Sequence, residues 1–162
     1  MRIKLLLALA LGIAFGLTIP FLACGGKATP NDDECQYIAD ATRLASDWHD
    51  AMLENVALVE EPDLSSSEWK SDFRVQLEEL KTVSRKVSEL NPPKSACISA
   101  ADFASATTDG ASAADLILQW LDDRDPDDLD RAIELLGQSA NGFEGTQASI
   151  KEFAATHEDS CP

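Results

Sequence analysis

The densest group of possible metal ligands in this chain is an acidic run between residues 122 and 130. Counted from the first candidate, carboxylates occur at positions 1, 3, 5 and 12, which is the ligand spacing of an EF-hand calcium loop. The four residues are Asp123, Asp125, Asp127 and Glu134. Position 6 of such a loop needs a glycine, and here it is Asp128. Because Pro126 also suits the first turn of a helix, we expect a capped helix start, with calcium binding as the less favoured interpretation.

Catalytic histidine chemistry has little support in the sequence. His49 and His157 are the two histidines, and neither lies in a spacing that binds zinc, di-iron or haem. The segment Asp47-Trp48-His49-Asp50 combines an imidazole with two carboxylates, but adjacent residues of a helix point in different directions. A polar helix face beside a buried Trp48 explains the segment better. We therefore expect no enzyme activity and no metal or other cofactor.

Four stretches with apolar residues at three- and four-residue steps predict the helices that position these groups. They cover approximately residues 32–59, 65–90, 94–121 and 125–154. Ser65 with Glu68 matches a capping box at the second start, and Asp125-Pro126 matches a capped start for the fourth. Gly110 lowers helix propensity by about 1 kcal/mol and marks a possible bend in the third.

These helices predict an all-α fold, with residues 32–162 forming an antiparallel up-down-up-down four-helix bundle. The sequence has no strand-like alternation of any length and no nucleotide-binding glycine loop. The expected core stripe of the first helix is Ile38, Ala41, Ala45, Trp48, Met52, Val56 and Val59. The expected stripe of the third is Cys97, Ala101, Ala104, Thr108, Ala111, Ala114, Leu118 and Leu121.

The first 25 residues have the three parts of an export signal. Arg2 and Lys4 are basic, residues 5–19 are apolar, and a helix-breaking proline precedes the segment Leu22-Ala23-Cys24-Gly25. This segment resembles the lipobox of bacterial lipoproteins, although Phe21 and Leu22 stand where that family prefers leucine and a small residue. The resemblance implies removal of a signal peptide, residues 1–23. It also implies a diacylglycerol thioether on Cys24, often with an amide-linked acyl chain such as palmitate.

Two other interpretations of this segment remain open. Residues 5–24 are long enough for an uncleaved anchor helix, and cleavage near Ala28 would release a secreted protein. All three place the folded part outside the cytoplasm, and lipidation places it at the extracytoplasmic face of the cell membrane. Removing Arg2 and Lys4 changes the formal net charge from −16 to −18, which repels nucleic acid and anionic head groups. Membrane attachment then depends on the acyl chains, with residues 24–31 as a flexible tether.

Three further cysteines, Cys35, Cys97 and Cys161, fall at one end of such a bundle. An extracytoplasmic compartment permits disulfides. The first and third helices would lie diagonally and the fourth would neighbour both, so Cys161 is the expected common partner. We favour Cys97 with Cys161 and keep Cys35 with Cys161 as the alternative. The bond would be structural, because no Cys-x-x-Cys motif is present to lower a thiol pKa.

The predicted function is a noncatalytic, lipid-anchored extracytoplasmic helical module that mediates protein–protein interaction in the cell envelope. Its acidic surface predicts a basic envelope or extracellular partner, with binding that weakens as salt rises, and excludes nucleic acid. The alternative is a lipoprotein that binds a small ligand or calcium, in the bundle interior or at the acidic run.

Overall fold

A computed structural model of the chain describes residues 32–60, 62–93 and 97–157. These ranges contain four α-helices and no strand, which confirms the all-α fold. The helices are α2 (Asp32–Glu60), α3 (Ser67–Ser88), α4 (Cys97–Asp123) and α5 (Pro126–His157). The predicted signal peptide and tether, including Cys24, lie outside the described residues.

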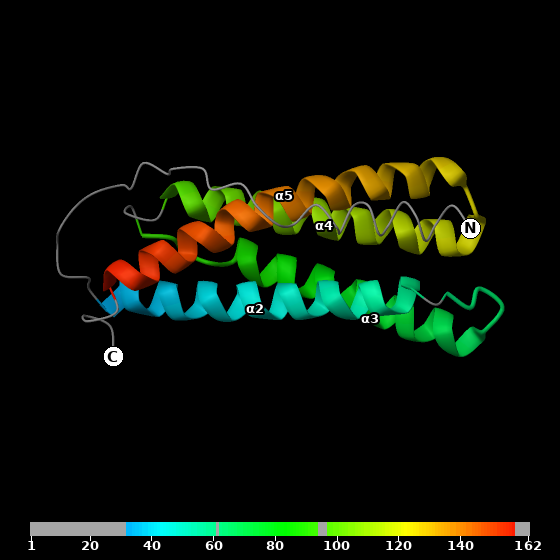
Figure 1. The fold of residues 1–162 in the computed structure, drawn as a ribbon, viewed down its shortest axis with the longest axis horizontal. Helices are drawn as coiled ribbons and strands as arrows, with labels where there is room; N and C mark the ends of the chain where they lie inside the picture. The colour runs from blue at the N-terminus through cyan, green and yellow to red at the C-terminus, as the bar shows by residue number, and fades with distance from the viewer. Residues whose placement is uncertain (1–31, 61, 94–96, 158–162) are drawn as a thin grey trace.

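Figure 1 shows the four helices side by side, with successive helices running in opposite directions along the long axis. α3 packs against α2 and α4, and α5 packs most extensively against α4. The contact between α2 and α5 is much smaller. These two helices meet where α2 begins and α5 ends, which we call the near pole, and they diverge toward the far pole (Figure 1). The bundle is therefore loosest along the seam between α2 and α5.

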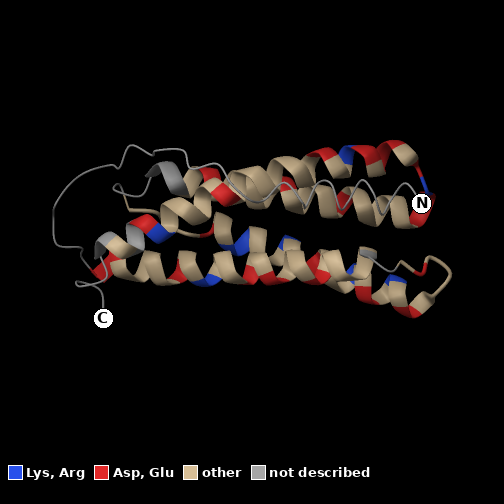
Figure 2. Cartoon of the chain, in the orientation of Figure 1, with Lys and Arg blue, Asp and Glu red and all other residues tan. Residues whose placement is uncertain are grey.

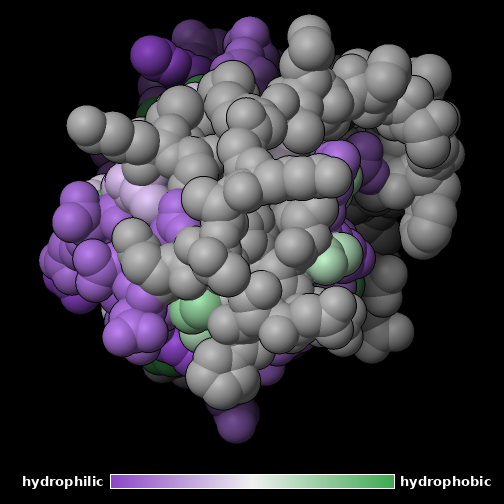
Figure 3. Space-filling view, turned by 90° about the vertical axis from the view of Figure 1, so that its left-hand side faces the viewer, coloured by the Kyte–Doolittle hydropathy of each residue, from purple (hydrophilic) through white to green (hydrophobic). Residues whose placement is uncertain are grey.

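The described side chains that are visible around the near pole are mostly polar (Figure 3). Figure 3 looks onto this pole, and the described side chains visible there are predominantly hydrophilic, with a few hydrophobic ones between them. Across the described residues, Leu53 and Val75 are the large hydrophobic side chains that are clearly exposed. Charged and polar groups thus cover most of the outside of the bundle.

The start of α3 is capped by Ser66, one residue later than the capping box predicts. The Ser66 hydroxyl accepts a hydrogen bond from the backbone N–H of Trp69. Ser65 instead donates through its backbone N–H and its hydroxyl to the Asp63 carboxylate, which also accepts from the Ser66 N–H. These bonds lower the pKa of Asp63, the Ser65 hydroxyl being the largest cause. The turn therefore uses an aspartate before the cap rather than the predicted Ser65–Glu68 pair.

The buried face of α2 agrees with the predicted stripe at only some of its positions. Ala41, Ala45 and Trp48 are buried as expected, but the other four predicted residues are half-buried. The buried residues of α2 are Tyr37, Ala41, Leu44, Ala45, Trp48, Ala51 and Asn55, and all but Ala45 follow one another at alternating four- and three-residue steps. This face includes one polar residue, Asn55, at a position that a hydrophobic side chain usually occupies.

Among the described side chains of the predicted α4 stripe, Ala114 and Leu121 are buried as expected and the others are not. Ala101 and Thr108 are exposed, whereas Phe103, Ala106 and Thr107 are buried. Alanine and threonine lie on both sides of this helix, so their periodicity does not distinguish one face from the next. The large aromatic and branched residues decide the orientation, because they have the most apolar area to bury.

Helix α4 runs through Gly110 without a break. Gly110 is buried against the indole of Trp48, which is itself 1 % exposed. A glycine here leaves space for a large ring from α2 to reach α4 across the centre of the bundle. The cost in helix propensity, about 1 kcal/mol, is offset by this packing.

Candidate functional site

The acidic run forms the turn between α4 and α5 and is organised by its own backbone. The Asp123 carboxylate accepts a hydrogen bond from the Asp125 N–H, and the Asp125 carboxylate accepts one from the Asp127 N–H, both at 3.0 Å. Arg124, between them, has a φ of 65°, in the left-handed region. Figure 2 shows how acidic residues gather around this turn at the far pole. Two of the four candidate calcium ligands therefore serve as helix and turn caps.

The candidate ligands do not converge on a common point. Asp123, Asp125, Asp127 and Glu134 are all exposed. In residues 32–60, 62–93 and 97–157, no group of three or more His, Cys, Asp or Glu side chains could hold a metal ion. Desolvation, followed by repulsion from the three neighbouring aspartates, raises the pKa of Asp128. The run is a strongly negative capping turn.

The segment around His49 is divided between core and surface. Trp48 is buried, whereas His49 and Asp50 are exposed and Asp47 is half-buried. Helix geometry thus turns the imidazole away from the tryptophan that precedes it. The segment does not enclose a reacting group.

The cysteines can be placed only in part. Cys35 lies in the first turn of α2 and is half-buried. Cys97 begins α4, but its side chain and all of Cys161 lie outside the described residues, as does the lipidation candidate Cys24. The predicted disulfide and the predicted lipid anchor therefore stay predictions.

A polar hollow of about 290 Å³ lies between α2 and α3, and we call it the acidic hollow. Four carboxylates and one ammonium group line it, together with Ala51, Thr82 and Val83. The charged residues are Asp47, Asp50 and Glu54 from α2, and Glu79 and Lys86 from α3. Four negative charges against one positive charge give the hollow a net negative potential.

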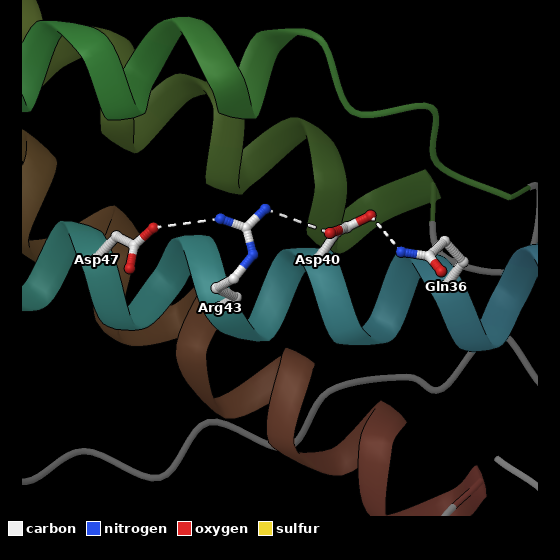
Figure 4. A network of polar contacts seen from close by, with 4 residues as sticks. All are labelled: Gln36, Asp40, Arg43 and Asp47. Atoms are coloured by element: carbon white, nitrogen blue, oxygen red, sulfur yellow. Dashed lines mark hydrogen bonds and ion pairs between the residues drawn. The ribbon is translucent and has the colours of Figure 1, made fainter. Parts of the chain in front are cut away.

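A chain of polar contacts along α2 leads to this hollow (Figure 4). The Gln36 amide donates to Asp40 at 2.8 Å, and the Arg43 guanidinium lies 3.3 Å from Asp40 and 3.5 Å from Asp47. The hydrogen bond from Gln36, followed by that from Arg43, lowers the pKa of Asp40. Arg43 is 57 % exposed, so these ion pairs contribute at most about 0.5 kcal/mol each. They place the Arg43 guanidinium beside Asp47, one of the carboxylates that line the hollow.

A second hollow lies inside the far half of the bundle, and we call it the apolar hollow. All four helices line it, and the exposed atoms of its wall are apolar. Asn55, which is 9 % exposed, is the polar residue of this wall. The two hollows lie on different sides of α2.

Comparisons with known proteins give no family for this chain: no family model, no curated protein and no solved structure matches it. Within the described residues, none of the helices combines the length and apolar character needed to cross a bilayer. The segment predicted to be an export signal lies outside the described residues.

The sequence motifs predicted neither hollow, although Asp47 and Asp50 of the acidic hollow belong to the segment considered for catalysis. The acids of α2 and α3 are far apart in sequence, and only the pairing of these helices brings Glu54 and Glu79 to one hollow. Asn55 did leave a signal, because it continues the heptad series Ala41, Trp48, Asn55 at seven-residue steps. Following that series, instead of the apolar residues alone, would have placed an amide in the core.

Proposed function

We propose that this protein is a noncatalytic, lipid-anchored extracytoplasmic module that binds a cationic segment of another envelope protein in the acidic hollow. The observation that carries the proposal is the set of four carboxylates around one hollow between α2 and α3. A Lys- or Arg-rich segment complements this charge, and its long side chains reach into a hollow of about 290 Å³.

The rest of the surface strengthens the attraction at long range. The chain carries a formal net charge of −16, and acidic residues are distributed along all four helices (Figure 2). Such a field steers cationic partners toward the molecule and raises their rate of association. Because the charges are exposed, the attraction is screened when the Debye length falls from about 30 Å at 0.01 M salt to about 8 Å at 0.15 M.

The lipid anchor is the second part of the proposal. The same negative charge repels anionic head groups, so membrane attachment requires acyl chains on Cys24 rather than surface electrostatics. The short tether, residues 24–31, joins Asp32 at the start of α2. In this arrangement the near pole is the end of the bundle closest to the membrane.

The binding test uses the full chain in nanodiscs of uncharged lipid and a short Lys-rich peptide labelled for fluorescence anisotropy. The variant Asp50→Asn/Glu54→Gln/Glu79→Gln removes three charges from the acidic hollow. We expect roughly tenfold weaker binding at low salt, from three exposed charge interactions of several tenths of a kcal/mol each. Binding by the unmodified chain should itself weaken as salt rises.

The matched control is Asp102→Asn/Asp130→Asn/Glu144→Gln, which removes three exposed acids outside the hollow. It should weaken peptide binding by no more than about twofold, because it lowers only the long-range field. Equal losses in the two triple variants would show that the peptide senses net charge alone. That result would overturn the assignment of the acidic hollow as the binding site.

A further inference from the structure

We propose that Met52 is an oxidation site, at which hydrogen peroxide converts the thioether to a sulfoxide and thereby loosens the bundle between α2 and α5. The site lies beside the apolar hollow and does not depend on the proposed binding of a protein partner. The chain has two methionines, Met1 and Met52, and the predicted cleavage before Cys24 leaves Met52 alone. Methionine sulfoxide is reduced again by methionine sulfoxide reductases, so the modification is reversible.

Met52 packs between two parts of the core. One cluster of buried side chains lies toward the near pole and includes Trp48 and Phe103, and the other lies toward the far pole and includes Phe73 and Leu136. Among the described residues, Met52 is the partly buried side chain that packs against both clusters. Its flexible, unbranched side chain suits such an irregular position. A change in the polarity of Met52 therefore affects both halves of the core.

The apolar hollow gives a small oxidant access to this side chain. Met52 lines the hollow from α2 and is only half-buried, and Leu136 lines it from α5. These two helices diverge toward the far pole (Figure 1). A water-sized molecule can reach about 30 Å³ of the hollow, and one water needs roughly 10 to 15 Å³. Hydrogen peroxide is only slightly larger than water and fits this space, whereas an organic peroxide does not.

The reaction is a transfer of one oxygen atom with two electrons. A lone pair of the Met52 sulfur attacks one peroxide oxygen, and the O–O bond breaks as the S–O bond forms. The departing hydroxide takes the proton of the transferred oxygen and leaves as water. The sulfur is oxidised by two electrons and the peroxide is reduced by two, so the protein has only to admit the oxidant.

The sulfoxide oxygen would find no hydrogen-bond donor in the wall of the hollow. Asn55 is the polar residue of this wall. Its Nδ2 already donates to the Ala51 oxygen at 2.8 Å and to the Gln76 oxygen at 3.3 Å, which uses both of its N–H groups. A buried acceptor without a partner is unfavourable. If the sulfoxide turns outward to water instead, Met52 no longer packs between the two clusters, and the bundle loosens in either case.

The access test compares two peroxides on the full chain in nanodiscs of uncharged lipid, with peptide mapping by mass spectrometry to measure oxidation at Met52. Each rate is divided by the rate for an unfolded peptide with the same local sequence, which removes the difference in intrinsic reactivity. We expect the resulting ratio to be about tenfold higher for hydrogen peroxide than for tert-butyl hydroperoxide, because susceptibility follows exposure. Equal ratios, or no oxidation of the folded chain by hydrogen peroxide, would overturn the proposal.

The effect on stability is measured by circular dichroism melting before and after treatment with hydrogen peroxide. In the unmodified chain, oxidation should lower Tm by roughly 3 to 10 °C, and methionine sulfoxide reductases should restore it. Met52→Leu keeps an apolar side chain of similar volume and should show no such loss. Any free thiol reacts with peroxide in both proteins, so the difference between them belongs to Met52.

Two glutamine variants separate the position from the chemistry of the oxidant. Met52→Gln introduces a polar side chain of similar length without peroxide and should lower Tm by a similar amount. Leu53→Gln makes the same change at the next residue, which is 53 % exposed, and should leave Tm nearly unchanged. Equal losses in the two variants would contradict the role assigned to Met52.

Hydrogen exchange measured by mass spectrometry locates the loosening. Oxidation should speed exchange mainly in residues 49–60 and 129–140, because Met52 and Leu136 line the hollow from these parts of α2 and α5. α3 and α4 should change less, since ion pairs such as Lys81–Asp115 join them. The proposal is overturned if exchange rises equally in all four helices, or if peroxide lowers Tm equally in the unmodified chain and in Met52→Leu. The comparison of peroxides and the reductase step use the unmodified chain, so the test stands even if a variant does not fold.

Discussion

The indole of Trp48 lies directly on the backbone of Gly110. A Cβ atom placed at residue 110 would be 2.4 Å from Cζ2 and 2.6 Å from Cη2 of Trp48, and 2.9 Å from the Ser139 hydroxyl. Real carbon atoms do not approach so closely, so the ring occupies the space that any side chain at 110 would need. One contact thus joins α2, α4 and α5 at the centre of the bundle.

Gly110→Ala is expected to destabilise the protein despite alanine's higher helix propensity. Overpacking a rigid ring costs about 1 to 3 kcal/mol, and the gain in propensity offsets about 1 kcal/mol of it. Urea unfolding should therefore show a lower free energy of unfolding. Gly137→Ala is the control, because nothing lies within 4 Å of a Cβ at residue 137. It should stabilise α5 by up to about 1 kcal/mol, and a stabilised Gly110→Ala would contradict the packing described for Trp48.

Asp125→Ala is expected to lower the free energy of unfolding by about 1 kcal/mol, because it removes the carboxylate that caps α5. Asp128→Asn should not destabilise the protein at neutral pH, since the surroundings of Asp128 disfavour its charged form. Thermal melting of the two variants separates capping from the general effect of charge in this run. A similar loss in both would indicate that negative charge at the helix start, rather than the Asp125 hydrogen bond, stabilises α5.

Stability is expected to fall as pH rises above about 10. Burial raises the pKa of Tyr37, and hydrogen bonds to Asp115 and Glu78, at 2.9 and 3.0 Å, raise the pKa of Lys81. In both groups the folded state favours the protonated form. The stability that Tyr37 and Lys81 contribute is fully present below their ordinary pKa values, about 10 and 10.4. It is lost as the pH rises through the raised pKa values of the folded state.

The check on this pH dependence is the melting temperature between neutral and strongly alkaline pH. Tyr37→Phe should reduce the alkaline loss, because phenylalanine has no ionisable group to bury. Lys81→Met should also reduce the alkaline loss of stability, because this variant has no Lys81–Asp115 ion pair between α3 and α4 for high pH to disrupt. An unchanged alkaline profile in the double variant would assign the loss to other groups.

Intact mass of the membrane-extracted protein tests the lipid anchor. We expect a chain that begins at Cys24 and carries a diacylglycerol group, with or without an additional acyl chain. Cys24→Ser should leave the signal segment uncleaved and remove the lipid mass. An unmodified Cys24 on a retained signal segment would instead support the anchor-helix interpretation.

Cys161 has two predicted disulfide partners, Cys97, which the sequence favours, and Cys35, which we test here as the alternative. Tyr37 near the start of α2 and Ile150 in α5 belong to one core cluster, and these helix ends meet at the near pole (Figure 1). The side chain of Cys35 is also engaged rather than free. Peptide mapping without reduction should recover this pair, and Cys35→Ser should lower the free energy of unfolding by up to about 4 kcal/mol. Recovery of a Cys97–Cys161 peptide would restore the pairing that the sequence favoured.

Local signals in the sequence determined the number of helices, their approximate ends and the polar exterior. The Asn91-Pro92-Pro93 segment, whose prolines cannot donate a backbone hydrogen bond, follows α3 after Glu89 and Leu90. The predicted Asp125-Pro126 start matches α5, since caps act through hydrogen bonds within a few residues. The core face of α3 was also predictable, because Phe73, Leu77 and Leu80 are large apolar residues among polar ones.

The tertiary structure decided which faces meet and what lies between them. In α2 and α4, alanines and other small residues occur on adjacent faces, and only contact with aromatic side chains such as Trp48 and Phe103 selected the buried one. The acidic hollow likewise exists only because α2 packs against α3. Hydrogen bonds that start and end a helix are local in sequence, whereas the space between helices depends on side chains that are distant in sequence.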